Sequence, residues 1–373
     1  MRFAGVLTLL TILGVSGGVA IAEDGVGGTP SGDSRREGSS MDLAENARVD
    51  VAYGPHPRNT LDFWKAKSAT PTPLLVVIHG GGFYGGSKEN LGGLDPGTFK
   101  EMMLAGISVA SINYRLTTDA GFPAQMLDAA RAVQFLRSKA QEWNLDPARV
   151  AASGGSAGGG ISLWLAFHDD LADPKSGDLV ERQSTRLTCA AVQGAQTSYD
   201  PRFFKSHFKG QVPLATKGIT GLFKLKDGEN LNPPPEKARL MEEASPITHA
   251  TADDPPVLLE YDRSLTSQCD IHHPVFGQVL KARLDELKVD CIFQTMEPGW
   301  KDRWVSIPAF LIRHLKAKAA VAEKDPKPVI RPAAKTDRKL TDRKFDSAWG
   351  GEAASRVGGY KGHLTKSYPA NLI

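Results

Sequence analysis

The sequence is poor in cysteine, with three cysteines among 373 residues. It contains no Cys-x-x-Cys or His-x-x-x-His spacing, so nothing in it predicts a metal site, and we expect none. Because the number of cysteines is odd, at least one thiol is free or pairs with another chain. We expect Cys189 and Cys291 to be small buried residues on strands, and the pairing of Cys269 stays open.

An excess of charge of one sign is also lacking. The 45 Lys and Arg residues nearly balance the 42 Asp and Glu residues, and the formal net charge is +3. No basic stretch is interleaved with aromatic residues, as a surface that binds single-stranded nucleic acid would require. The composition therefore excludes nucleic acid as the expected partner. It does not indicate an oligomeric state.

Long apolar runs are absent beyond the first 22 residues. Arg2 is followed by the apolar stretch Val6–Val15 and by Ala20-Ile21-Ala22, a small-x-small cleavage site. This pattern is typical of a secretory signal peptide, and the apolar stretch is too short and too glycine-rich at its end to favour a membrane anchor. We expect a secreted or periplasmic protein with no transmembrane segment after the signal is removed.

The rest of the chain has the composition of a globular protein, at 41% hydrophobic and 23% charged residues. Residues 23–45 are rich in glycine, serine and charge, which predicts a flexible leader. Residues 317–373 are rich in Lys, Ala, Pro, Gly and Arg, which predicts a disordered basic tail. The sequence thus indicates one folded domain over residues 46–316.

Strands and helices alternate through this domain. Strands are predicted at residues 74–78, 107–114, 150–152, 190–193, 256–261 and 290–296, and helices at residues 126–143, 161–167, 274–287 and 307–315. Such alternation predicts an α/β fold with a mostly parallel, doubly wound sheet whose chemistry lies at the carboxyl ends of the strands. Residues 200–245 do not fit the alternation, so we expect an insertion that forms a cap over the site.

The strongest motif is Gly154-Gly155-Ser156-Ala157-Gly158, a match to G-x-S-x-G between a predicted strand and a predicted helix. A sharp turn from strand to helix would hold Ser156 in a strained backbone conformation, and the flanking glycines avoid clashes there. The helix that begins after it contributes its positive N-terminal end, which favours a developing anion. Ser156 is therefore the predicted nucleophile.

A second motif, His79-Gly80-Gly81-Gly82-Phe83, follows a buried strand. Its glycines allow backbone N–H groups to point at one spot. The N–H groups of Gly81, Gly82 and Ala157 are the predicted oxyanion hole, where each donor contributes about 3–4 kcal/mol in the transition state. We expect His79 to order the loop.

Residues 80–85 also satisfy G-x-G-x-x-G, the dinucleotide-binding pattern. That pattern must open a helix, and the sequence after it is a poor helix start. We therefore expect no nucleotide cofactor.

Several motifs together resemble the esterase/lipase branch of the α/β-hydrolases, similar to carbohydrate-esterase-like and hormone-sensitive-lipase-like members. In chain order they are His79-Gly80-Gly81-Gly82-Phe83, Gly85-Gly86-Ser87-Lys88-Glu89-Asn90, Asn113-Tyr114-Arg115-Leu116, the stretch from Phe122-Pro123-Ala124 to Asp128, Leu145-Asp146-Pro147-Ala148-Arg149-Val150 and Gly154-Gly155-Ser156-Ala157-Gly158-Gly159. The resemblance covers about Val49 to Leu315. It implies an eight-stranded α/β-hydrolase sheet, no cofactor, and hydrolysis of carboxylic esters through an acyl-enzyme.

The family places its acid after the strand predicted at 256–261 and its histidine later in the chain. Asp262 and Asp270 both qualify as the acid. Asp270 is followed by Ile271-His272-His273-Pro274, which resembles the family's acid-x-x-x-Pro spacing, and we prefer it.

The family's histidine belongs to the loop after the last strand, and here that loop, residues 297–304, contains none. His314 lies in the closing helix and is expected to be structural. The remaining candidates are His207, His272 and His273. We select His272, because the acid's loop lies at the same edge of the sheet as Ser156.

Two hypotheses follow. The first is a serine esterase acting on a small-molecule or carbohydrate-linked ester, in which His272 takes the proton of Ser156 and Asp270 orients His272. The second is a hydrolase-like binding protein without turnover, because a serine hydroxyl without an adjacent base is a weak nucleophile.

Overall fold

The computed structural model describes residues 47–208, 217–268, 270–297 and 304–322. The predicted signal peptide, the leader and most of the predicted tail lie outside these residues. Residues 317–322 of the predicted tail continue the last helix instead. Among the described residues, no helix has the length and apolar character that a membrane crossing needs.

Eight strands form one sheet in the order β1-β2-β4-β3-β5-β6-β7-β8. Strands β3 to β8 pair in parallel, whereas β2 pairs antiparallel with both β1 and β4. The predicted mostly parallel sheet is thus confirmed. The strands are β1 (Ala47–Ala52), β2 (Thr60–Trp64), β3 (Thr72–Ile78), β4 (Ser108–Ile112), β5 (Leu145–Gly155), β6 (Cys189–Gln193), β7 (Val257–Tyr261) and β8 (Cys291–Thr295).

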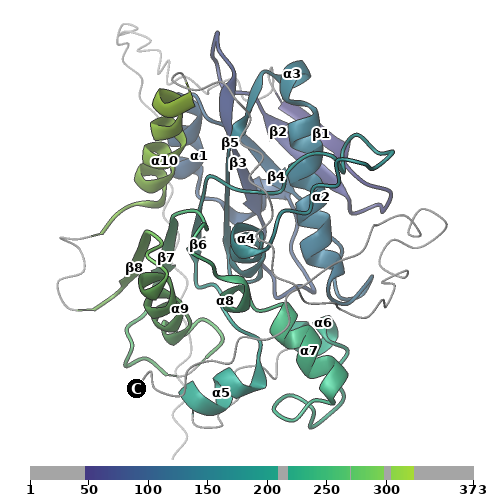
Figure 1. The fold of residues 1–373 in the computed structure, drawn as a ribbon, viewed down its shortest axis with the longest axis vertical. Coiled ribbons are helices and arrows are strands. Elements are labelled where there is room, and N and C mark those ends of the chain that lie inside the picture. The colour runs from purple at the N-terminus through teal and green to yellow at the C-terminus, as the bar shows by residue number, and fades with distance from the viewer. Residues whose placement is uncertain (1–46, 209–216, 269, 298–303, 323–373) are drawn as a thin grey trace, which may run out of the picture. The chain divides into compact units, whose positions relative to one another are not determined.

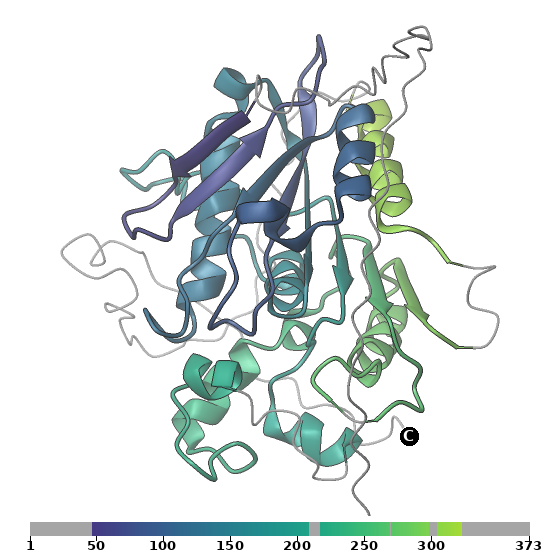
Figure 2. The same cartoon turned by 180° about the vertical axis from the view of Figure 1, so that it is seen from behind.

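Helices cover both faces of the sheet (Figures 1 and 2). Helices α1 (Pro96–Leu104) and α10 (Ile307–Ala322) lie on one face, and α2 (Ala124–Ser138), α4 (Ala157–Phe167) and α9 (Val275–Glu286) lie on the other. Every residue of β3 is buried, and its side chains alternate between the two faces. This two-sided burial explains the continuous apolar run at residues 74–78.

The helix predicted over 126–143 is two helices. Helix α2 begins at Ala124 and ends at Ser138, and the short helix α3 (Ala140–Trp143) follows it. Asn144 ends α3 in the left-handed conformation, with φ of 55°, which asparagine tolerates better than most residues. This turn leads the chain into β5.

The insertion contains three short helices, and the second of them packs on the glycine-rich loop. They are α5 (Pro201–His207), α6 (Lys217–Leu222) and α7 (Pro235–Glu243), followed by α8 (Pro246–His249). A Cβ at Gly218 of α6 would lie 1.7 Å from the carbonyl oxygen of Gly82, so only glycine allows this approach. The insertion therefore supports the loop that carries the predicted oxyanion donors.

Candidate active site

Ser156 stands in a sharp turn between β5 and α4, as the motif predicts. Its backbone has φ of 53° and ψ of −119°, a conformation that costs a non-glycine residue about 1–3 kcal/mol. Hydrogen bonds hold it on both sides, from Ser156 N–H to the Gln193 carbonyl at 2.8 Å and from Gly160 N–H to the Ser156 carbonyl at 2.9 Å. The surrounding structure thus fixes the strained serine at the carboxyl edge of the sheet.

The glycines of this turn are required by close backbone packing. A Cβ at Gly154 would lie 2.4 Å from the carbonyl oxygen of Ile78, and a Cβ at Gly158 would lie 2.0 Å from the same oxygen. Both positions pack against the end of β3. The G-x-S-x-G pattern is therefore a consequence of how tightly β3, β5 and α4 meet.

His272 is the histidine that the structure brings to Ser156. Its Nε2 lies 2.8 Å from Ser156 Oγ. The imidazole packs over Gly194, whose added Cβ would lie 3.4 Å from the ring. The side-chain amide of Gln196 donates to the Ile271 carbonyl at 2.8 Å, which ties the histidine's loop to the segment after β6.

The other candidate histidines point elsewhere. His273 Nδ1 accepts the N–H of Val275 at 3.1 Å. His207 lies against Phe203, with ring centroids 4.7 Å apart, and His314 lies against Phe310 at 4.4 Å. Of the histidines in the described residues, only His272 is hydrogen-bonded to Ser156.

Asp270 holds the loop of His272 rather than its ring. One carboxylate oxygen accepts the backbone N–H of His272 at 2.7 Å, and the other pairs with the guanidinium of Arg263. The expected arrangement, in which Asp270 contacts the imidazole, is therefore not what the structure has. The reason is local, because the backbone N–H of His272 and the guanidinium of Arg263 each bind one oxygen of the Asp270 carboxylate.

Asp262 and Arg263 set the charge around His272. Burial lowers the pKa of His272, Arg263 lowers it further, and the carboxylate of Asp262 opposes both. Asp262 is largely exposed, and its Oδ1 lies 3.6 Å from Arg263 Nε. The sequence interpretation missed Arg263, although its place two residues after β7 puts it at the functional edge.

A cleft of about 550 Å³ opens at the carboxyl ends of the strands and includes Ser156 and His272 in its wall. Its charged lining residues are Asp95, Glu260, Asp262 and Arg263. None of the described residues of the insertion lines it. The described part of the insertion packs on the glycine loop through Gly218. The expected cap over the site stays a prediction.

The glycine loop passes directly beside the serine turn. A Cβ at Gly80 would lie 2.9 Å from the Gly155 carbonyl oxygen and 3.7 Å from Ser156 Cβ. Gly81 and Gly82 have positive φ values of 99° and 60°. Within the described part of the chain, the N–H groups of Gly81, Gly82 and Ala157 make no hydrogen bond. Of this loop, Gly80 lines the cleft, whereas Gly81, Gly82 and Ala157 are not among its lining residues, and their role as oxyanion donors stays a prediction.

His79 anchors this loop to Tyr114. Its carbonyl accepts the hydroxyl of Tyr114 at 3.0 Å, and its ring stacks on Tyr114 with centroids 4.2 Å apart. Its Nδ1 lies 2.7 Å from the Gly80 carbonyl oxygen, and its Nε2 lies 3.3 Å from Arg58 Nη2. Burial lowers the pKa of His79 to about 4, so the ring is neutral at neutral pH.

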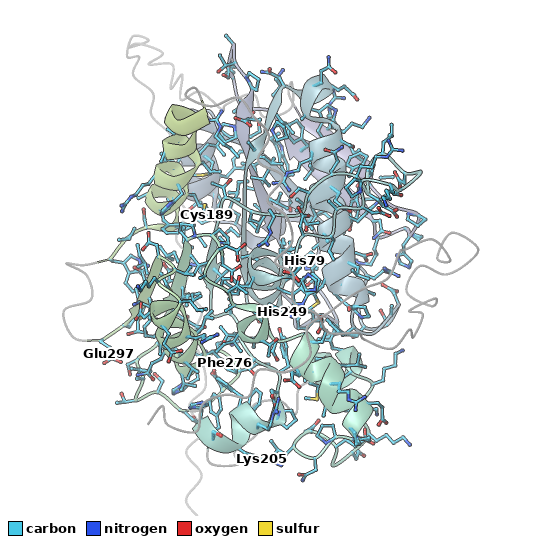
Figure 3. The ribbon with its side chains drawn as sticks, viewed as in Figure 1. His79, Cys189, Lys205, His249, Phe276 and Glu297 are labelled. Atoms are coloured by element: carbon cyan, nitrogen blue, oxygen red, sulfur yellow. The ribbon has the colours of Figure 1, made fainter. Side chains whose placement is uncertain are left out.

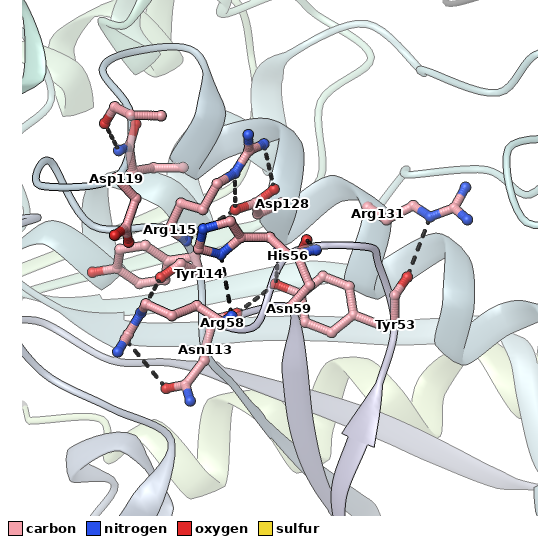
Figure 4. A network of polar contacts seen from close by, with 12 residues as sticks. Tyr53, His56, Arg58, Asn59, Asn113, Tyr114, Arg115, Asp119, Asp128 and Arg131 are labelled. Carbon is pink, nitrogen blue, oxygen red and sulfur yellow. Dashed lines mark hydrogen bonds and ion pairs between the residues drawn. The ribbon is translucent and has the colours of Figure 1, made fainter. Parts of the chain in front are cut away.

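Figure 4 shows the polar network that holds Arg58 and Tyr114 in place. Arg58 Nε donates to the Tyr114 carbonyl at 2.8 Å, and Arg115 forms a buried ion pair with Asp128 at 2.7 Å. The network extends from the β1–β2 turn to α2. The loop that carries the predicted donors is thus anchored to the core of the domain.

The strand order, the serine turn and the glycine loop together define an α/β-hydrolase of the esterase/lipase branch. The chain belongs to the BD-FAE family, whose model matches residues 61–264. The matched segment contains both the glycine loop and the serine turn. It ends before Asp270 and His272.

Several relatives are named as ester hydrolases. The chain is 29% identical over 221 residues to the probable carboxylic ester hydrolase LipM of Mycobacterium tuberculosis, covering 58% of this chain and 47% of that protein. It is 27% identical over 215 residues to esterase LipC of the same organism, covering 57% and 49%. The matched part thus spans about half the length of these relatives.

Solved structures show the same fold. A truncated carbohydrate esterase from gut microbiota superimposes with a TM-score of 0.57 at 17% identity, covering 75% of this chain and 99% of that one. An acetyl ester-xyloside bifunctional hydrolase from Caldicellulosiruptor lactoaceticus superimposes with a TM-score of 0.51 at 22% identity, covering 70% and 89%.

Proposed function

We propose that the protein hydrolyses carboxylic esters through an acyl-enzyme on Ser156, with His272 as the general base. The observation that carries this proposal is the 2.8 Å contact between Ser156 Oγ and His272 Nε2. That distance lies within the range of about 2.6–3.2 Å that a nucleophile and its base require. The names of the relatives support ester hydrolysis as the reaction.

In the proposed reaction, His272 Nε2 takes the Ser156 proton while Oγ bonds to the ester carbonyl carbon. The N–H groups of Gly81, Gly82 and Ala157 hold the resulting oxyanion. His272 then gives its proton to the leaving alcohol, and the acyl group stays on Ser156. Water, deprotonated by His272, releases the acid and restores the serine.

The substrate that we propose is a short acyl ester or an ester carried on carbohydrate. The cleft is open and about 550 Å³ in volume, and no described residue of the insertion narrows it. A bulky alcohol such as a sugar therefore has room beside Ser156. The signal-like residues 1–22 support export, and we propose a secreted or periplasmic location.

Wild-type protein tests this function directly. We expect it to hydrolyse p-nitrophenyl acetate and to react with a fluorophosphonate probe, while heat-denatured protein does neither. A folded protein that does neither would support the alternative, a hydrolase-like binding protein without turnover. The specific observation behind that alternative is that the His272 ring contacts no carboxylate among the described residues.

The pH profile is a second test. Because the base must be neutral, kcat/KM is expected to rise with pH and to level off above the pKa of His272. That pKa is lowered by burial and by Arg263, so the midpoint of the rise should lie below the ordinary histidine value of about 6.5.

The Arg263→Gln variant is the matched comparison for this profile. Removing the cation beside His272 should raise the pKa of His272 and move the midpoint to higher pH. The carboxylate of Asp270, which then has no guanidinium partner, should raise that pKa further. A wild-type midpoint above 6.5, or a midpoint that falls in Arg263→Gln, would contradict His272 as the base.

A further inference from the structure

Three side chains with metal-binding atoms meet outside the cleft. His168 caps the C-terminus of α4, Glu243 is the last residue of α7, and His249 is the last residue of α8. Their candidate ligand atoms all lie within 4.8 Å of one another. Figure 3 labels His249, close to α8. The cluster joins the helix that follows Ser156 to the end of the insertion.

The spacing of the three side chains approaches that of a zinc site. His168 Nε2 lies 3.6 Å from Glu243 Oε1, and His249 Nε2 lies 3.9 Å from the same oxygen. Nitrogen and oxygen ligands at about 2.0–2.1 Å from a tetrahedral zinc ion stand roughly 3.4 Å apart. The two distances between imidazole and carboxylate therefore need to shorten by at most about 0.5 Å around an ion, and the two imidazole nitrogens lie within 4.8 Å of each other.

The ring of His168 is oriented as a ligand would be. Its Nδ1 lies 2.9 Å from the Asp169 carbonyl oxygen, and its ring stacks on Trp164 with centroids 4.1 Å apart. A proton held on Nδ1 by that carbonyl leaves the lone pair on Nε2, the atom that faces Glu243. Metal-binding histidines are commonly fixed by such a second hydrogen bond.

His249 can turn to an ion at small cost. Its Nε2 lies 2.7 Å from the backbone carbonyl oxygen of Glu243, and binding through Nε2 would shift its proton to Nδ1 and break this hydrogen bond. The same carbonyl also accepts the indole N–H of Trp164 at 3.1 Å. Because Trp164 stays in place, the carbonyl keeps a partner when His249 binds the ion.

We propose that His168, Glu243 and His249 form a structural site for Zn²⁺ that fastens α7 and α8 to α4. Their side chains are 7%, 15% and 11% exposed, so an ion there is largely enclosed by protein. Two imidazoles and one carboxylate favour zinc, cobalt or nickel over magnesium or calcium, and water completes the coordination. The residues are far apart in sequence, which is why no spacing motif reveals them.

Chelator-treated full-length protein tests the site by calorimetric titration with Zn²⁺ and by visible absorption after addition of Co²⁺. We expect one equivalent of either ion to bind, with ligand-field bands for Co²⁺. At a free Zn²⁺ concentration about 100-fold above Kd, the melting temperature should rise by roughly 5 °C. Folded wild-type protein that binds neither ion would overturn the proposal.

Glu243→Gln and His249→Gln keep the size of each side chain and should lose both the binding and the thermal shift. His207→Gln is the matched control, since it removes an imidazole from the same insertion that contacts Phe203 rather than the cluster. Circular dichroism verifies folding of each variant. Equal binding by wild type and both cluster variants would also overturn the proposal, because the ion would then lie elsewhere.

Discussion

Replacing Ser156 by alanine is expected to lower kcat/KM for p-nitrophenyl acetate on the order of 10⁴-fold or more and to abolish fluorophosphonate labelling. The change removes the only atom that can form the acyl-enzyme in the proposed reaction. The backbone donors at Gly81, Gly82 and Ala157 remain, so hydrolysis roughly 10³–10⁴-fold above the uncatalysed rate can persist. Stopped assays and in-gel fluorescence measure the two effects.

A glycine variant separates lost chemistry from lost structure. Ser156→Gly also removes Oγ, but glycine adopts a φ of 53° and ψ of −119° without the strain that serine and alanine carry. Its melting temperature should equal or exceed that of Ser156→Ala, while both variants stay inactive. Labelling of either variant at the wild-type level would show that another residue is the nucleophile.

The serine turn could be predicted because its constraints are local. The clashes that force glycine at 154 and 158 involve one carbonyl, that of Ile78, at the end of a strand that the sequence also displays as an apolar run. Strand, turn and helix follow one another without interruption. A short stretch of sequence therefore contains nearly all of the information that positions Ser156.

The partner of Ser156 is determined by contacts between distant segments. Two adjacent histidines, His272 and His273, look equivalent in the sequence. The carboxylate of Asp270 turns the backbone at His272, and Gly194 provides the surface on which that ring packs. His273 is directed to Val275 and Phe208 instead. The sequence could narrow the base to this loop, and only the fold distinguishes its two members.

The place of the insertion depends on a similar long-range contact. Residues 200–245 break the alternation of strands and helices, so the sequence itself indicates that they are an insertion. The packing of α6 on the glycine loop depends on Gly218, because only glycine at this position allows α6 to approach the Gly82 carbonyl. One glycine in a segment of short helices carries no recognisable signal of that contact. The sequence could therefore indicate the insertion but not its contact with the glycine loop.

His272→Ala is expected to lower kcat/KM on the order of 10³-fold or more, with little change in melting temperature. Ser156 would then lose the base that takes its proton, while the turn and the glycine loop stay intact. Removing the ring opens a space beside Gly194, so added imidazole should restore part of the rate. Steady-state kinetics with and without imidazole measures both effects.

His273→Ala is the matched control, because it removes the neighbouring imidazole from the same loop without touching Ser156. Its kcat/KM should stay within a few-fold of wild type. Equal losses of kcat/KM in the two variants would indicate that activity depends on the conformation of the loop and not on His272 as a base. A fully active His272→Ala would mean that another group accepts the proton. Only a large loss confined to His272, partly reversed by imidazole, fits a base that has moved from the loop after the last strand to the loop of Asp270.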